Sequence, residues 1–207
     1  MLGQRILTKR KLMSMKTHVN ASATKRIPTD EELMALPKDG YKRELLHGEI
    51  VMSPAGFDHG RKIARFMTVL ASFVYQHDLG EIFDGQTGFR MKSLDLLSPD
   101  ISFVPRDRLA KLTGNPEGFF EGAPDLAIEF LSPGDSKKRL RDKLSQYLEN
   151  GTRLAWVMDS KKRTVAVHHT NKPEQVLSDS DELSGEEVVP GFLISVANIF
   201  AQFDYRR

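Results

Sequence analysis

The chain has 207 residues, of which 40% are hydrophobic and 28% are charged, so it can bury the core of one domain. It contains no run of about 18 apolar residues, and we expect no membrane-spanning helix. Cysteine is absent, which excludes disulfides, thiolate metal sites and cysteine nucleophiles; this fits a reducing compartment, and we expect a cytoplasmic protein.

Positive charge is concentrated at the N-terminus. Residues 1–26 contain seven of the 30 Lys and Arg residues and none of the 28 Asp and Glu residues, so the remaining 23 basic and 28 acidic residues carry a formal charge of −5. Proteins that bind nucleic acid non-specifically usually present a basic surface to the phosphates. Any positive surface of this domain that meets nucleic acid must therefore be local.

Residues 1–26 lack the long apolar core and the cleavage pattern of a secretory signal. We expect a basic, disordered tail, or a true start further along at Met13 or Met15; a nucleic-acid-binding arm and a transit peptide are the alternatives. Residues 27–207 are expected to form a single domain.

The first predicted elements are a short helix and a β-hairpin. Thr29 and Glu32 form a capping box, which opens a helix. Residues 41–46 and 49–52 read as the two strands of a hairpin. Glu44 lies in the first strand, where a solvent-facing position is expected.

A long helix is predicted from about Asp58 to His77, because its apolar residues recur at helical spacing. We expect it to be the main cover of a sheet. His59 lies near its start and could bond a carboxylate or a phosphate, although a single histidine at a helix end is more often a cap or a solvated side chain.

The next segments are predicted strands at 81–83, 87–91 and 101–104. Asp100 directly precedes the last of these and follows Pro99. Such pairs are common in turns, so a turn residue is one interpretation of Asp100 and a catalytic acid is the other.

Residues 126–131 form a short apolar run bounded by prolines, which predicts a strand covered on both faces. Glu129 places a carboxylate inside this run. An unpaired charge there would cost several kcal/mol, roughly, unless a metal ion, a cation or hydrogen bonds meet it.

A helix is predicted directly after this strand, with Ser132, Asp135 or Ser136 as its cap and Asn150-Gly151 at its end. Its first half is basic, with Lys137, Lys138, Arg139, Arg141 and Lys143. On a helical wheel Lys143 falls at the edge of the apolar stripe, so it can point along the sheet rather than into water.

The C-terminal part is predicted to form a hairpin from 154–159 and 164–169, small strands at 174–177 and 183–189, and a short helix within 192–203. Trp156 is expected to be buried. The sequence contains no internal repeat, zinc-ligand spacing, P-loop or GxSxG motif, so nucleotide-dependent and serine-hydrolase chemistry lack support.

The order and spacing of several segments resemble the Uma-type family of restriction endonucleases, within the PD-(D/E)XK nuclease superfamily. The segments are YKRELLHGEIVMSPAG (41–56), the helix opening at His59, SPDISFV (98–104), GAPDLAIEFLSPGDS (122–136), KLSQYLENG (143–151), LAWVMD (154–159) and LSGEEVVPGF (183–192). The resemblance covers residues 29–200. It implies an α/β fold with a restriction-endonuclease-like core, in which a central mixed β-sheet is flanked by helices.

The resemblance also implies a site. Asp100 and Glu129 match the metal-binding acids, and Glu44 matches a glutamate of the N-terminal hairpin. Leu131 stands where the superfamily motif has lysine. The resemblance implies that the lysine has moved to the following helix, with Lys143 as the match and Lys137 as the competitor.

From these residues we expect a site for Mg²⁺ or Mn²⁺. Asp100, Glu129 and the backbone carbonyl of Phe130 would hold the ion, and Glu44 would complete its shell through water. Lys143 would steady the attacking water or the growing negative charge. Flanking phosphates would meet Lys137, Lys138, Arg141 and His59.

The favoured interpretation is a metal-dependent endonuclease that hydrolyses phosphodiester bonds of nucleic acid, with DNA as the first expectation and a homodimer as a possible assembly. One alternative is a catalytically silent nuclease-fold protein that binds nucleic acid or a protein partner. Another is that Glu129 and Lys143 form an internal ion pair and nothing more.

Overall fold

The computed structural model describes residues 26–37, 42–53, 56–132 and 136–204. The predicted tail up to residue 25, Tyr41 of the first hairpin strand and the candidate cap Asp135 lie outside these ranges. The helices of the described residues are α1 (Asp30–Met34), α2 (Phe57–Gln76), α3 (Arg106–Leu109), α4 (Lys137–Glu149) and α5 (Val196–Ala201).

Two mixed sheets and a strand pair make up the β-structure of the described residues. The larger sheet has the order β11-β10-β9-β8-β6-β3, with β3 (Gly80–Asp84), β6 (Ile101–Pro105), β8 (Leu126–Phe130), β9 (Leu154–Asp159), β10 (Thr164–His168) and β11 (Gln175–Leu177). The smaller sheet has the order β2-β1-β5-β4-β7, with β1 (Lys42–Leu46), β2 (Glu49–Ser53), β4 (Phe89–Arg90), β5 (Leu96–Leu97) and β7 (Phe120–Glu121). The pair is β12 (Glu182–Ser184) with β13 (Leu193–Ser195).

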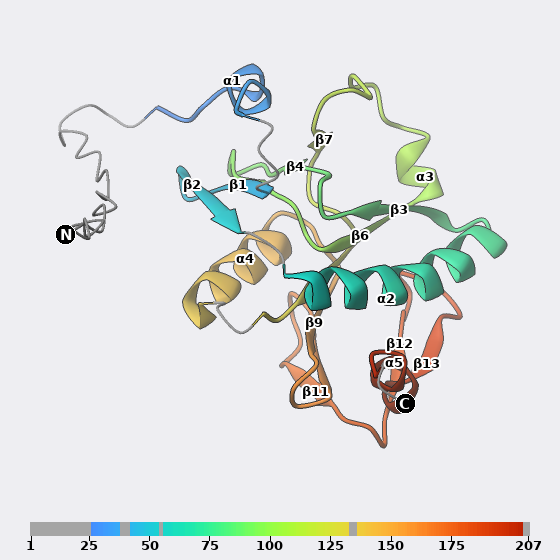
Figure 1. Ribbon diagram of the computed structural model, residues 1–207. Helices are drawn as coiled ribbons and strands as arrows, with labels where there is room; N and C mark the ends of the chain where they lie inside the picture. The colour runs from blue at the N-terminus through green and yellow to red at the C-terminus, as the bar shows by residue number, and fades with distance from the viewer. Residues whose placement is uncertain (1–25, 38–41, 54–55, 133–135, 205–207) are drawn as a thin grey trace, which may run out of the picture.

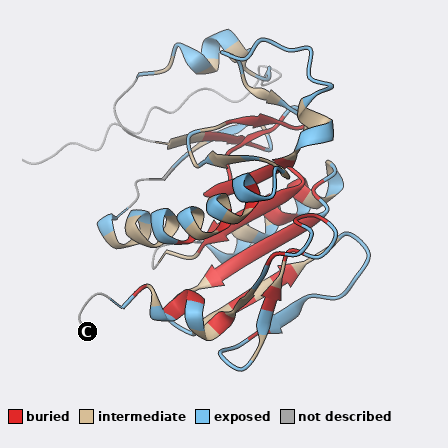
Figure 2. Ribbon diagram, turned by 90° about the vertical axis from the view of Figure 1, so that its right-hand side faces the viewer, coloured by how far each residue is buried: buried red, intermediate tan, exposed pale blue. Residues whose placement is uncertain are grey.

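The larger sheet lies in the middle of the molecule, with α2 across one face (Figure 1). Apolar residues of α2 and α5 pack on that face around Trp156, which is fully buried as predicted. The opposite face packs against α4 and the smaller sheet through residues such as Leu144 and Tyr147. Figure 2 shows the buried residues gathered on the strands between these layers. The expected central mixed sheet flanked by helices is confirmed.

Local signals explain where the helices begin. The Thr29 side chain accepts a hydrogen bond from the Glu32 N–H and the Glu32 side chain accepts one from the Thr29 N–H, which confirms the capping box. The Ser136 side chain accepts from the Arg139 N–H, so Ser136 is the cap of α4. None of the helices in the described part of the chain combines the length and the hydropathy needed to cross a bilayer.

β8 is the strand that carries Glu129. It runs parallel to β9 and antiparallel to β6, and all five of its residues are buried, so the prediction of a strand covered on both faces is confirmed. Successive side chains of a strand point to opposite faces. Ile128 therefore packs toward α2, whereas Glu129 points toward α4.

Two predicted strands are shorter than expected. Of 87–91 only Phe89–Arg90 pairs as β4, because the Met91 N–H bonds the Asp95 carbonyl and closes a turn. Of 183–189 only the first part pairs as β12. The N–H groups of Val188 and Val189 both bond the Gly185 carbonyl, so the chain turns there.

Gly80, the first residue of β3, gives a test of the packing between β3 and β6. A Cβ at this position would lie 2.2 Å from the Val104 carbonyl oxygen and 2.8 Å from the Pro105 Cα. Because backbone atoms would have to move, Gly80→Ala should lower the free energy of unfolding by at least about 2 kcal/mol. Gly60→Ala on α2, where an added Cβ would meet no atom within 4 Å apart from the adjacent residues and the backbone of its own helix, should be neutral or stabilising by up to about 1 kcal/mol. Urea denaturation measures both, and equal effects would contradict this packing.

Candidate active site

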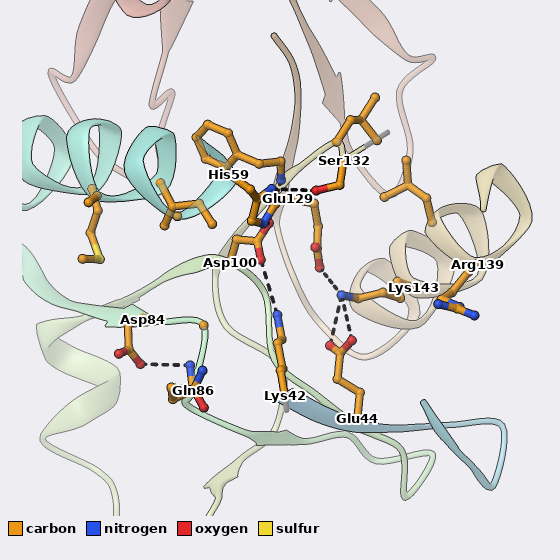
Figure 3. A pocket seen from close by; sticks show the side chains of 18 of the residues that line it. Lys42, Glu44, His59, Asp84, Gln86, Asp100, Glu129, Ser132, Arg139 and Lys143 are labelled. Carbon is orange, nitrogen blue, oxygen red and sulfur yellow. Dashed lines mark hydrogen bonds and ion pairs between the residues drawn. The ribbon is translucent and has the colours of Figure 1, made fainter. Parts of the chain in front are cut away.

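A cavity of about 370 Å³ opens between the start of α2, the first half of α4 and strand β1, at the edge where β6 begins and β8 ends. Its floor carries acidic and basic side chains from all of these elements (Figure 3). The ionisable residues on its lining are Lys42, Glu44, His59, Asp84, Asp100, Glu129, Arg139 and Lys143.

Asp100 and Glu129 line the same cavity although they are 29 positions apart in the sequence. The pairing of Ile101 with Ile128 sets this register, because it brings the residue before β6 beside the end of β8. The Phe130 N–H donates a hydrogen bond of 2.8 Å to Asp100 Oδ2. The two acids therefore lie side by side (Figure 3).

Lys143 lies between two carboxylates. Its Nζ is 2.6 Å from Glu129 Oε1 and 3.0 Å from Glu44 Oε1, with Oε2 of Glu44 at 3.2 Å. Tyr147, one turn further along α4, donates its hydroxyl to Glu129 Oε1 at 2.7 Å. Lys137, the competing lysine, is exposed and is not on the cavity lining, so Lys143 is the helix lysine that meets the acids.

The expected solvent-facing position of Glu44 is wrong. Glu44 is only 6% exposed, and besides Lys143 it accepts a hydrogen bond of 2.8 Å from the Ser98 N–H. The reason is tertiary: β1 pairs with β5 and its sheet packs against α4, so a strand residue that looks exposed in the sequence faces another layer.

His59 is also not a solvated helix-end residue. Its Nδ1 lies 2.8 Å from the Ser132 hydroxyl, and its Nε2 lies 3.5 Å from Asp100 Oδ2. His59 therefore meets a carboxylate, one of the two partners that the sequence suggested, and helps to orient Asp100.

Three predicted phosphate-binding residues do not reach the cavity. Lys137, Lys138 and Arg141 are exposed and absent from its lining, and Lys138 forms a salt bridge of 2.8 Å with Asp142. Arg139 occupies the cavity rim instead. Helical geometry explains the difference, because Arg139 lies four residues before Lys143 and shares its side of the helix.

Sequence reasoning missed Lys42, whose Nζ lies 3.4 Å from Asp100 Oδ1. It also missed the roles of Tyr147 and Ser132. The spacing of Tyr147 four residues after Lys143 was a usable signal, because such residues share one side of a helix. No sequence signal distinguished Lys42 from other lysines at the start of a strand.

The pKa values of the acids respond to burial and to the two lysines. Burial opposes ionisation of Asp100, yet the hydrogen bond from His59 and the charge of Lys42 outweigh it and hold the pKa of Asp100 well below its usual range. Burial likewise acts against Glu44, but Lys143 and Lys42 lower its pKa below the ordinary value. Glu129 differs: burial raises its pKa, the nearby charge of Asp100 acts the same way, and Lys143 compensates only in part.

This arrangement fits a magnesium or manganese ion. Magnesium is usually held by one or two carboxylates, with waters and substrate phosphates completing its shell, and Asp100 and Glu129 supply two carboxylates. No group of three or more His, Cys, Asp and Glu side chains within the described residues could hold an ion together. Glu44 is paired with Lys143 and the Ser98 N–H, and its part in the shell of an ion stays a prediction. The role of the Phe130 carbonyl stays a prediction.

Residues 30–197 match the family model of Uma2, whose description is "Putative restriction endonuclease". Among solved structures, the chain is similar to the crystal structure of "a putative nuclease belonging to DUF820" from Anabaena variabilis ATCC 29413. The identity is 21%, the TM-score is 0.74, and the match covers 86% of this chain and 99% of that chain. This likeness shows a nuclease-like fold. A comparison with curated proteins gave no match.

Lys143→Met tests the buried charge cluster. Removing the ammonium leaves Glu44 and Glu129 without their shared cation, so the free energy of unfolding should fall by about 3–5 kcal/mol near neutral pH. Without Lys143 the pKa of Glu129 rises further. A group whose pKa is higher in the folded than in the unfolded state stabilises the fold at low pH and loses that effect as pH rises through the folded value. The deficit should therefore shrink as pH falls.

Urea denaturation at several pH values checks this prediction. The matched control is Lys138→Met, which removes an exposed salt bridge of the same helix and should cost at most about 1 kcal/mol. A deficit in Lys143→Met that equals the control, or that does not change with pH, would refute the assigned role.

Proposed function

The chain belongs to the Uma2 family, and we propose that it is a metal-dependent endonuclease that hydrolyses phosphodiester bonds of nucleic acid, with DNA as the substrate. The observation that carries the proposal is the pair of adjacent acids, Asp100 and Glu129, on the wall of an accessible cavity that two lysines also line. An ion pair between Glu129 and Lys143 with a purely structural role would require neither the adjacent acid Asp100 nor a cavity beside it.

The charge of the cluster supports binding of a divalent ion. Within the described residues, the ammonium groups that meet Glu44, Asp100 and Glu129 are those of Lys42 and Lys143. With all three carboxylates ionised, the cluster has one negative charge in excess. A bound divalent ion would reverse this sign, and the cluster would then attract a phosphodiester monoanion.

The reaction adds one water molecule across a phosphodiester. A bond forms between the water oxygen and phosphorus, one P–O ester bond breaks, and the proton released by the water is balanced by protonation of the leaving oxygen. A bound ion would lower the pKa of a coordinated water and neutralise phosphate charge. Asp100 and Glu129 would hold it, while His59, the Phe130 N–H and Tyr147 keep the two carboxylates in position.

Of the Lys and Arg residues that the structure describes, Arg139 and Lys42 line the cavity besides Lys143. They can meet the phosphates of a bound strand, because guanidinium and ammonium groups are the usual partners of phosphate oxygens. Together with a bound divalent ion, these cations would supply the local positive charge that nucleic-acid binding needs in a chain whose residues after position 26 carry a net negative charge.

Glu129→Gln tests the function. The amide keeps the size of the side chain and can still accept the Tyr147 hydroxyl, but it lacks the charge needed to hold the ion. We expect the affinity for Mn²⁺, measured by calorimetry, and the rate of DNA cleavage each to fall at least about 100-fold. The circular dichroism spectrum should stay unchanged.

The matched control is Glu81→Gln on the exposed face of β3, which should leave Mn²⁺ binding and cleavage as in the wild type. Cleavage by Glu129→Gln at the wild-type rate would exclude this site as the catalytic one. A wild-type protein that binds DNA but does not cut it with Mg²⁺ or Mn²⁺ would instead be a catalytically silent protein with a nuclease fold.

A further inference from the structure

The two lysines of the cavity differ in how far their N–H groups are already used. A lysine ammonium has three donors, and the Lys143 ammonium lies within hydrogen-bond distance of three oxygens, one of Glu129 and two of Glu44. Its side chain is 9% exposed. Lys143 could turn to a substrate only by leaving a buried carboxylate without its cation, which is unfavourable.

Lys42 is much less constrained. Among the described residues its one polar partner is Asp100, at 3.4 Å, close to the limit of a hydrogen bond. Its side chain is 16% exposed. Figure 3 shows Lys42 reaching Asp100 from β1, whereas Lys143 reaches Glu129 from α4. Lys42 thus has donors left for a group that enters the cavity.

Gly85, which also lines the cavity, shows that there is space next to the Lys42 ammonium. A Cβ at this position would lie 3.7 Å from Lys42 Nζ and 3.5 Å from the Asp100 Cα, so any larger side chain would begin beside the ammonium. Gly85 is not among the residues with positive φ, and the backbone does not require glycine there. The absence of a side chain leaves space next to the Lys42 ammonium on the cavity wall.

We infer that Lys42, and not Lys143, is the lysine that contacts the scissile phosphate. This inference rests on the proposed function. The Lys42 ammonium donates a hydrogen bond to a non-bridging phosphate oxygen and stabilises the negative charge that grows there as the ester bond breaks. Lys143 is a positioning residue, which holds Glu129 and Glu44 in place without touching the substrate.

The first test measures binding without chemistry. A short fluorescein-labelled DNA is titrated with the full-length protein in Ca²⁺, and the affinity is followed by fluorescence anisotropy at several salt concentrations. Loss of one phosphate contact should weaken binding in Lys42→Met and reduce the slope of log affinity against log salt by about 1. Lys42→Arg should restore the slope. Lys111→Met, which changes an exposed lysine beside α3 at another cavity, should match the wild type.

The second test adds Mn²⁺ and measures the single-turnover cleavage rate. Calorimetry measures the Mn²⁺ affinity of the same variants. Lys42→Met should cut about 10²- to 10³-fold more slowly than the wild type while its Mn²⁺ affinity stays close to the wild-type value. Lys42→Arg should recover part of the rate. A strong loss of Mn²⁺ affinity in Lys42→Met would overturn the inference, because Lys42 would then act only through Asp100.

The outcomes separate the two proposals. A wild type that cleaves, with Lys42→Met unchanged in slope and rate, overturns the role of Lys42 and leaves the nuclease function standing. A wild type that binds DNA without cleavage, with the reduced slope in Lys42→Met, overturns the nuclease function and supports the phosphate contact. A wild type that neither binds nor cleaves overturns both.

Discussion

The contact of Lys143 with Glu44 and Glu129 is the interaction on which the rest of the site depends. The three residues come from α4, β1 and β8, so one ammonium joins the helix, the smaller sheet and the larger sheet. All three are buried, where a charge without a partner is unfavourable by several kcal/mol, roughly. The layers can approach this closely at the cavity because Lys143 supplies a cation to both carboxylates.

This constraint also determines how the other residues can act. The Tyr147 hydroxyl and the Lys143 ammonium both contact Oε1 of Glu129. The antiparallel pairing of β6 with β8 places Asp100, the residue before β6, beside Glu129. Asp100 is held in turn by His59 and the Phe130 N–H. The acids are therefore pre-organised by the chain itself, which is what a site for a small divalent ion requires.

The cluster combines structural and chemical roles in neighbouring residues. Lys143 compensates buried carboxylates and is itself enclosed, while Lys42 stands beside Gly85 with space next to its ammonium. Burial and the nearby charge of Asp100 raise the pKa of Glu129, and Lys143 compensates only in part. Under the proposed function, a divalent ion held by Asp100 and Glu129 would add positive charge to a cluster of three carboxylates and two lysines.

The sequence alone determined the longer helices and the strands of the larger sheet in their order, and it identified Glu129 as an anomaly, because a carboxylate within an apolar strand violates local patterning. It also brought out Asp100 and Lys143 through the order of the family segments. It did not determine that Glu44 is buried, that Lys42 reaches Asp100 or that Lys137, Lys138 and Arg141 miss the cavity. Strand and helix periodicity define faces within one element, whereas these positions depend on how β1 packs against α4 and how β6 pairs with β8. Such contacts between distant segments exist only in the tertiary structure, which is why it alone decided which charges meet.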